Sequence, residues 1–335
     1  MQQTQSMQAA LSAFTAGLID YAGLFPPAAL DMAPAIENFL RYRSGPFAPQ
    51  LGAFVVPAAR LDELDGYAAG FQKQATAAGP VPFSVLAGGG TDAALYRNHF
   101  EAALHKAQTF LERHGAAVRI SAFEVRLPEE LPEPEPLREL LSENITQVRE
   151  TLSCAPDFFF EPKRDGSWHS TVHRLVPALA AVQPSFGGAL TGFKLRCGGV
   201  KAEMFPSVGE VACAIHACVQ AGVPMKATAG LHHPVRHFNE SVGTRMHGFL
   251  NVFGALALTK AHGWRISQTE TMLADEQAAS FRFTNEGFGY RDFSLSTAQL
   301  RQSRAILATS YGSCSFAEPL EDLHALGLLP ARPEL

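Results

Sequence analysis

The sequence predicts a single (β/α)8 barrel, the TIM-barrel fold of the α/β class, and three observations lead to this prediction. Short apolar segments bounded by turn residues alternate with longer amphipathic segments, which is typical of repeated βα units around a parallel sheet. The chain has 335 residues, a length that suits one such barrel with insertions. An open doubly wound sheet usually carries a GxGxxG turn after an early strand, and the glycine-rich segment 86–95, LAGGGTDAAL, does not have that spacing.

We expect eight barrel strands, each followed by a helix. In chain order the predicted strands are 18–24, 51–56, 82–87, 118–124, 157–161, 190–195, 223–228 and 280–284. The predicted helices are 30–44, 60–77, 92–114, 136–152, 169–182, 207–221, 240–261 and 297–310. The whole chain, 1–335, is therefore expected to form one barrel domain, with a helical extension at 1–17 and a C-terminal tail at 311–335.

Composition and charge exclude several classes of partner. The net charge is −5 and no basic block occurs, so the sequence gives no support for nucleic-acid binding. The longest apolar run, 248–258, is too short to span a bilayer, and the first residues lack the pattern of a secretory signal. Five cysteines without a CxxC pair fit reduced thiols. We therefore expect a cytoplasmic protein without a membrane partner.

An aromatic-rich segment, 280–295, allows three interpretations. Its phenylalanines suit a barrel core, but the segment can also cap the barrel mouth or form a subunit contact in a homo-oligomer.

Polar side chains stand near the predicted carboxyl ends of the strands, where barrel enzymes place their active sites. Lys194 and Arg196 are two residues apart and therefore share one side of their strand. The candidate site residues among them, from the first strand to the seventh, are Asp20, Arg60, Glu124, Glu161, Lys194, Arg196, Lys226 and Thr228.

The two lysines are the feature from which we predict chemistry. One lysine at a strand end can simply extend its ammonium group to solvent. Lys194 and Lys226 on adjacent strands, with Arg196 beside them, would crowd three cations in a small mouth. Crowding of this kind predicts either an anionic substrate group that compensates the charge or a lysine pKa lowered enough to supply a neutral amine nucleophile.

Three segments carry a resemblance to a known family. They are IDYAGLFPPAALDMAPAIENFL at 19–40, GFKLRCGG at 192–199 and VPMKATAGLHHP at 223–234. The sequence resembles deoxyribose-phosphate aldolase, a class I aldolase barrel that works through a lysine Schiff base. The resemblance implies that Lys194 forms the imine and that Lys226 lowers its pKa. It also implies that Glu124 transfers protons and that Asp20 matches the first-strand aspartate of the family.

The sequence departs from that family at several points. The residues after each lysine differ, and the phosphate-binding Gly-Ser turn expected after the eighth strand is replaced by TNEGFGYRD at 284–292. We therefore expect a small anionic carbonyl substrate whose carboxylate is held by Arg196, since a planar guanidinium suits a carboxylate. No cofactor is expected. The other predicted substrate-binding residues are Thr228, Arg60, Glu161, His232 and His233.

Two other functions remain open. The segment GLHHPVRHFNE places His232, His233 and His237 together, and the last two have i, i+4 spacing in a helix that Pro234 would open. With Glu161 or Glu124 they predict a zinc or other divalent site and a metal-dependent hydrolase or isomerase. A non-catalytic barrel that binds an organic acid is the third possibility.

Overall fold

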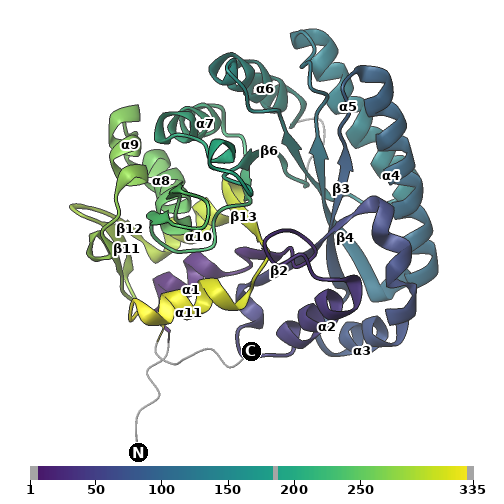
Figure 1. The fold of residues 1–335 in the computed structure, drawn as a ribbon, viewed down its shortest axis with the longest axis horizontal. Helices are drawn as coiled ribbons and strands as arrows, with labels where there is room; N and C mark the ends of the chain where they lie inside the picture. Colours follow the sequence, from purple (N-terminus) through teal and green to yellow (C-terminus); the bar gives the residue numbers. More distant parts are fainter. Residues whose placement is uncertain (1–6, 184–187, 330–335) are drawn as a thin grey trace, which may run out of the picture.

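The computed structural model describes residues 7–183 and 188–329, and eight parallel strands in them close into a barrel (Figure 1). The strand order around the barrel is β1-β13-β7-β6-β5-β4-β3-β2, closed by the pairing of β1 with β2. The barrel strands are β1 Ile19–Tyr21, β2 Leu51–Pro57, β3 Val81–Gly88, β4 Val118–Arg126, β5 Asp157–Glu161, β6 Thr191–Arg196, β7 Met225–Thr228 and β13 Ala308–Ser313. The predicted barrel fold is confirmed.

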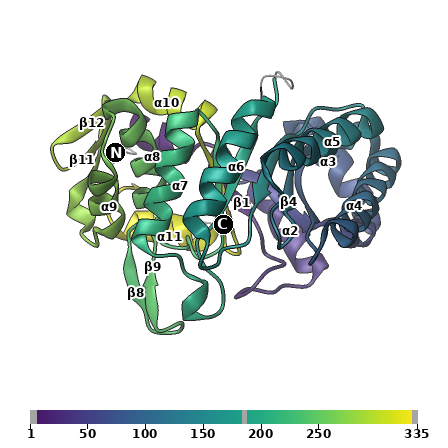
Figure 2. The same cartoon turned by 90° about the horizontal axis from the view of Figure 1, so that it is seen from above.

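Helices cover the outside of the barrel (Figure 2). The α-helices are α1 Ala9–Thr15, α2 Met32–Arg43, α3 Ala68–Ala78, α4 Ala93–His114, α5 Pro134–Leu152, α6 Trp168–Val182, α7 Val208–Ala221, α8 Phe249–His262, α9 Ile266–Ala274, α10 Thr297–Ile306 and α11 Ala317–Ala325. The 3₁₀ segments are η1 Ala48–Gln50, η2 Ala58–Tyr67, η3 Gly115–Ala117, η5 Ala202–Met204 and η6 Ala278–Ser280. The predicted segments at 92–114, 136–152, 169–182 and 207–221 correspond closely to α4, α5, α6 and α7.

Local sequence explains where several helices begin and end. Asp92 caps α4 by accepting a hydrogen bond from the backbone N–H of Leu95 at 2.9 Å. Ser207 and Glu210 form a reciprocal capping box at the start of α7, and Gly222 ends that helix in the left-handed conformation. These signals fix the α7 helix between β6 and β7, the two strands that carry the lysines.

The predicted strand at 280–284 forms, but its expected place as the eighth barrel strand is wrong. It is β10 (Phe281–Phe283), which pairs with β11 (Gly287–Tyr290) and β12 (Phe293–Ser296) in a separate antiparallel sheet. Phe281 and Phe283 are buried whereas Arg282 is exposed, an alternation typical of a sheet with one solvated face. The barrel instead closes with β13, ATSYGS, whose small and polar residues do not form an apolar run.

The aromatic segment 280–295 forms a sheet separate from the barrel, and none of its residues lines the two cavities at the carboxyl ends of the barrel strands. The ring of Phe14 in α1 lies 5.5 Å, centroid to centroid, from the rings of both Phe283 and Phe288. Phe283 and Phe288 also contact each other across the sheet at 4.9 Å. These rings belong to the hydrophobic core outside the barrel strands, and a subunit contact of the segment stays a prediction.

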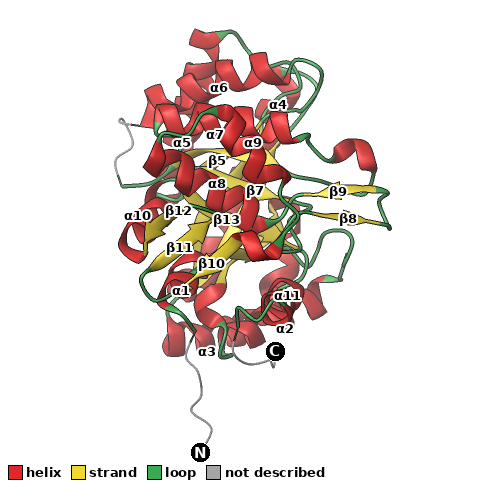
Figure 3. Ribbon diagram, turned by 90° about the vertical axis from the view of Figure 1, so that its left-hand side faces the viewer, coloured by secondary structure: helices red, strands yellow, loops and turns green. Residues whose placement is uncertain are grey.

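Three other predicted boundaries change. The expected helix at 240–261 begins only at Phe249, because a hairpin of β8 (His237–Asn239) and β9 (Thr244–Met246) precedes it and projects from the body (Figure 3). The helix expected at 297–310 ends at Ile306. The expected C-terminal tail starts inside β13 and continues into α11. Residues 1–6 of the expected extension and 330–335 of the expected tail lie outside the described residues.

The barrel core is formed by large apolar and aromatic side chains between strands and helices, and Phe54, Phe83, Phe158 and Phe193 are all fully buried. Burial of side chains of this size supplies the main driving force for folding. Over the described ranges, no helix is both long and apolar enough to cross a membrane.

Candidate active site

Both lysines point into the barrel from neighbouring strands. Lys194 of β6 and Lys226 of β7 are direct register partners, and their side chains are only 5% and 2% exposed. Because neighbouring positions in parallel strands face the same side of the sheet, the register brings the two amines into one interior. The sequence expectation that the lysines lie together is therefore correct.

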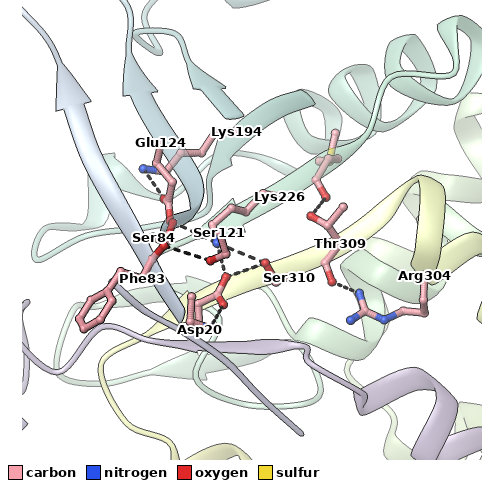
Figure 4. Close-up of polar contacts among 12 residues, drawn as sticks. Asp20, Phe83, Ser84, Ser121, Glu124, Lys194, Lys226, Arg304, Thr309 and Ser310 are labelled. Atoms are coloured by element: carbon pink, nitrogen blue, oxygen red, sulfur yellow. Dashed lines mark hydrogen bonds and ion pairs between the residues drawn. The ribbon is translucent and has the colours of Figure 1, made fainter. Parts of the chain in front are cut away.

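Three carboxylates contact the two lysines, and Figure 4 shows two of them, Glu124 and Asp20. The Nζ of Lys194 lies 2.9 Å from Oε2 of Glu124 and 2.7 Å from Oε2 of Glu161. The Nζ of Lys226 lies 3.2 Å from Oε1 of Glu124 and also contacts Oδ2 of Asp20. Glu124 of β4 is thus shared by both lysines.

Arg196 extends this series towards the mouth of the barrel. Its Nε donates to Oε1 of Glu161 at 2.7 Å, and its side chain is 41% exposed. The result is an interior row of alternating charges, in the order Arg196, Glu161, Lys194, Glu124, Lys226 and Asp20. We call this row the charge ladder.

The charge ladder corrects the predicted electrostatics of the lysines. Burial alone would lower the pKa of Lys194, but the carboxylates of Glu124 and Glu161 outweigh it and raise that pKa. The pKa of Lys226 is likewise raised, by Asp20 and Glu124 against the effect of burial. The expected lowering of the lysine pKa is wrong for the free protein, because three carboxylates balance the three cations.

The carboxylates of Glu124 and Glu161 are held in their ionised form. Burial would raise the pKa of Glu124, but the two lysines and the hydroxyl of Ser84 lower it to about 2. Burial would also raise the pKa of Glu161, and Lys194 and Arg196 lower it instead. Each of these two carboxylates contacts two cations, so its charge is compensated locally.

Hydroxyl and backbone groups complete the contacts of the carboxylates. Ser84 of β3 donates to Oε1 of Glu124 at 2.6 Å, and Ser310 of β13 donates to Oδ2 of Asp20 at 2.6 Å. The backbone N–H of Ala53 donates to Oδ1 of Asp20 at 2.6 Å. Sequence reasoning missed both serines. Ser84 interrupts an apolar strand, and a lone polar residue in such a strand could have indicated a site residue. Ser310 lay in a segment that was expected to be helical.

The two lysines border different cavities. At the carboxyl ends of the strands, Lys194 and Arg196 line one cavity of about 260 Å³ and a second of about 510 Å³. Lys226 and Asp20 line a cavity of about 560 Å³ at the opposite, amino-terminal end of the strands. Active sites of barrel enzymes lie at the carboxyl ends of the strands, and this is the end at which Lys194 lines its two cavities.

The 260 Å³ cavity also brings in residues from the ends of the last two barrel strands. Thr228 ends β7, His232 follows that strand, and Cys314 follows β13. The predicted substrate-site residues Thr228 and His232 therefore lie with Lys194, and Glu161 lines the neighbouring cavity. Cys314 was missed, because it lay in the segment expected to be a tail.

Two predicted substrate-binding residues lie elsewhere. Arg60 is part of η2 and forms a bidentate ion pair with Glu63, with both donor–acceptor distances 2.7 Å. His233 contacts Asp322 of α11 through Nδ1. Neither residue lines the mouth cavities that contain Lys194. The sequence placed them near strand ends but did not show which way their side chains turn.

The predicted metal cluster does not form. His237 starts strand β8, so it and His233 do not have helical i, i+4 geometry, although their rings are 4.2 Å apart. His232 contacts Cys314 and Glu318, and Nδ1 of His237 contacts the carbonyl of Val235. Among residues 7–183 and 188–329, no group of three or more His, Cys, Asp or Glu side chains is arranged to hold a metal ion.

The change of the eighth strand also alters the comparison with the aldolase family. The segment 284–292 is not the turn after the eighth strand, because that strand is β13. Gly312 and Ser313 end β13, and Cys314 and Ser315 follow them. The absence of a Gly-Ser pair at 284–292 is therefore no longer an argument against a phosphorylated substrate.

Comparisons with known proteins add the following. No protein-family model matches the chain, and no curated protein does. It is similar to malate synthase of Haloferax volcanii in a magnesium/glyoxylate complex, with a TM-score of 0.41 and 12% identity over 85% of this chain and 73% of that chain. It is also similar to xylanase B of Clostridium stercorarium F9, with a TM-score of 0.37 and 11% identity over 92% of this chain and 88% of that chain. Similarities this weak carry no argument about the site.

Proposed function

We propose that the protein is a carbon–carbon lyase of the class I aldolase type, in which Lys194 forms an imine with a small anionic carbonyl compound. The observation that carries the proposal is the convergence of Lys194 and Lys226 on the single buried carboxylate of Glu124. An amine, a second cation and a shared proton acceptor are the groups that imine chemistry uses.

Imine formation begins with the loss of a proton from Lys194, because only the neutral amine is a nucleophile. The ammonium group contacts Glu124 and Glu161, so either carboxylate is positioned to accept that proton. The amine then attacks the carbonyl carbon, and the carbonyl oxygen leaves as water. Lys226 stays charged and offsets the negative charge on Glu124, while Asp20 holds Lys226 in place.

Arg196 supports an anionic substrate. Only its Nε is engaged, by Glu161, and no described residue forms a hydrogen bond with its two Nη groups. These groups lie at the mouth, where Arg196 lines both cavities that contain Lys194. A planar guanidinium with two free donors binds a carboxylate well, so a carbonyl acid satisfies both Lys194 and Arg196.

Trapping with borohydride tests the imine directly. Pyruvate and other small carbonyl acids are incubated with the protein, the imine is reduced, and the adduct is mapped by mass spectrometry. We expect the adduct on Lys194 and its loss in Lys194→Arg, since arginine keeps the charge that Glu124 and Glu161 require but forms no imine. Lys163→Met is the matched control, because Lys163 is 42% exposed and pairs with Glu129 outside the ladder.

Two results would contradict the proposal. An adduct that persists in Lys194→Arg places the chemistry elsewhere. Binding of a carbonyl acid, seen as a rise in thermal stability, without any trapped adduct would instead favour the non-catalytic organic-acid barrel.

A further inference from the structure

The 260 Å³ cavity at the mouth joins two chemically different groups of side chains. Lys194 and Arg196 belong to β6, whereas His232 and Cys314 follow β7 and β13. Apolar side chains, among them Phe25 and Val55, line much of the remaining wall. A volume of about 260 Å³ lies below the range of about 300–1,000 Å³ that holds drug-sized ligands, so the cavity suits small reactants.

His232 is held in a fixed orientation through one of its two nitrogens. Its Nδ1 lies 3.3 Å from Oε2 of Glu318 in α11 and 3.7 Å from Sγ of Cys314. No described residue forms a hydrogen bond with Nε2, and that atom is not among the buried polar atoms without a partner. Nε2 is therefore the nitrogen available to a ligand in the cavity.

The contacts of His232 also keep the ring protonated. Burial alone would lower the pKa of His232, but its hydrogen bonds to Cys314 and Glu318 raise that pKa to about 9. The ring can then donate a proton at neutral pH, which an ordinary histidine does less well.

We propose that His232 is the catalytic proton donor to the carbonyl oxygen of a second reactant, a short uncharged aldehyde held in the same cavity as the Lys194 adduct. The proposal rests on the proposed function, since it requires a carbon nucleophile attached to Lys194. It assigns the two ends of the cavity to two substrates: the carbonyl acid at Lys194 and Arg196, and the aldehyde at His232.

The bond changes balance as follows. The protonated imine (iminium) of Lys194 loses a proton from the carbon next to the former carbonyl to a carboxylate of the ladder, which gives a neutral enamine. The enamine carbon attacks the aldehyde carbon, a carbon–carbon bond forms, and the electron pair of the aldehyde C=O moves to its oxygen. His232 gives that oxygen a proton, water hydrolyses the resulting iminium and frees the product, and the carboxylate proton returns to His232 through solvent.

The charges around His232 explain why the aldehyde is uncharged. Glu318 pairs with His232, and Asp322 pairs with the adjacent His233, so this end of the cavity has no excess of positive charge. Arg196 also lines the cavity, next to Lys194 on β6, and its two Nη groups form no hydrogen bond with a described residue. An anionic group therefore belongs to the first reactant.

The test separates the two halves of the reaction. With pyruvate alone, we measure the trapped Lys194 adduct and the exchange of the pyruvate methyl protons in D₂O by NMR. With pyruvate plus acetaldehyde or glycolaldehyde, we measure the aldol product. For His232→Asn we expect trapping and exchange close to the wild-type level, and product formation slower by about 100-fold or more, the usual contribution of a general acid.

Two variants serve as controls. His233→Asn changes the neighbouring residue, which contacts Asp322 and does not line the cavity, and it should form product at the wild-type rate. Cys314→Ser should slow product formation less than His232→Asn does, because it alters one contact of the ring and leaves the imidazole in place. Retained trapping in His232→Asn also shows that this variant is folded.

Each remaining outcome decides the question. Three results would overturn the assignment of His232. In His232→Asn, these are product formation at the wild-type rate, or a loss of trapping as large as the loss of product. In the wild-type protein, the third is the trapping of pyruvate without product from either aldehyde. A wild-type protein that traps no carbonyl acid overturns the proposed function itself, and the role of His232 fails with it.

Discussion

Lys194 and Lys226 face each other as register partners on β6 and β7, and one carboxylate, that of Glu124, contacts both of their amines. The carboxylate of Glu124 thus lies between the two ammonium groups and reduces their mutual repulsion. This arrangement determines how the site should respond to mutation and to pH.

Removal of Lys226 should destabilise the protein strongly. Lys226→Met leaves Asp20 without its cation and Glu124 with only one, and breaking a buried pair in this way costs about 3–5 kcal/mol. The free energy of unfolding from urea denaturation measures the effect. Asp20→Asn in the same chain should recover part of the loss, because it removes the unpaired charge. Lys106→Met, which breaks an exposed pair with Asp62, should cost about 1 kcal/mol or less.

Imine formation should become faster as the pH rises through the neutral range. The carboxylates of Glu124 and Glu161 raise the pKa of Lys194 despite its burial, so the amine is mostly protonated at neutral pH. Below that pKa, the neutral fraction grows about tenfold for each pH unit. The initial rate of adduct formation with excess carbonyl acid checks this. A rate that falls with increasing pH would show that a group other than the Lys194 amine limits the reaction.

Acid should weaken the folded state through Glu124. Its pKa is lowered to about 2 in the folded protein, against 4.5 for an ordinary glutamate, so the unfolded chain binds the proton first as the pH falls. The contribution is fully present above about pH 4.5 and is lost as the pH approaches about 2, and it amounts to roughly 3 kcal/mol. Urea unfolding at a series of pH values measures it. Glu124→Gln should flatten this part of the profile, and an unchanged slope in that variant would refute the assignment.

Ser84 should stabilise the protein more than its neighbour Ser121. The hydroxyl of Ser84 is fully buried and donates to Glu124, so Ser84→Ala should cost about 1–3 kcal/mol. Ser121 donates to the backbone carbonyl of Phe83 and is only partly buried, and Ser121→Ala should cost about 1 kcal/mol. Thermal or urea unfolding of the two variants compares them. Equal losses would mean that the contact with Glu124 adds nothing.

The sequence predicts the barrel and its lysine pair well, because both depend on local patterns. Apolar periodicity locates seven barrel strands, and the motifs around Lys194 and Lys226 lie on adjacent strands as expected. The eighth barrel strand was not predicted, because β13 is made of small and polar residues. The segment of β10 has the apolar pattern of a strand and was chosen in its place. Residues far apart in the sequence, such as His232 and Cys314, come together only once that strand is placed.

The pKa shifts of the site residues could not be predicted from local sequence patterns. The sequence indicates which residues carry charge, but it does not give the distances between them. Glu124 and Glu161 were expected near the lysines as a proton carrier and a substrate ligand. Their oxygens lie 2.7–3.2 Å from the lysine amines, so carboxylates offset the repulsion expected among the cations. The pKa of Lys194 is therefore raised, whereas the sequence had suggested that it is lowered.

The pairing of β1 with β13 has a consequence for the way the chain reaches its native state. Ile19 pairs with Tyr311, so the ring of strands is joined by residues near the two ends of the described chain. On the ribosome, the edges of β1 and β7 stay without their final partner until β13 emerges, and exposed edges of this kind favour association between chains. Contacts of such long sequence separation also slow folding. A nascent chain stopped before residue 308 should therefore depend on chaperones more than the finished protein does.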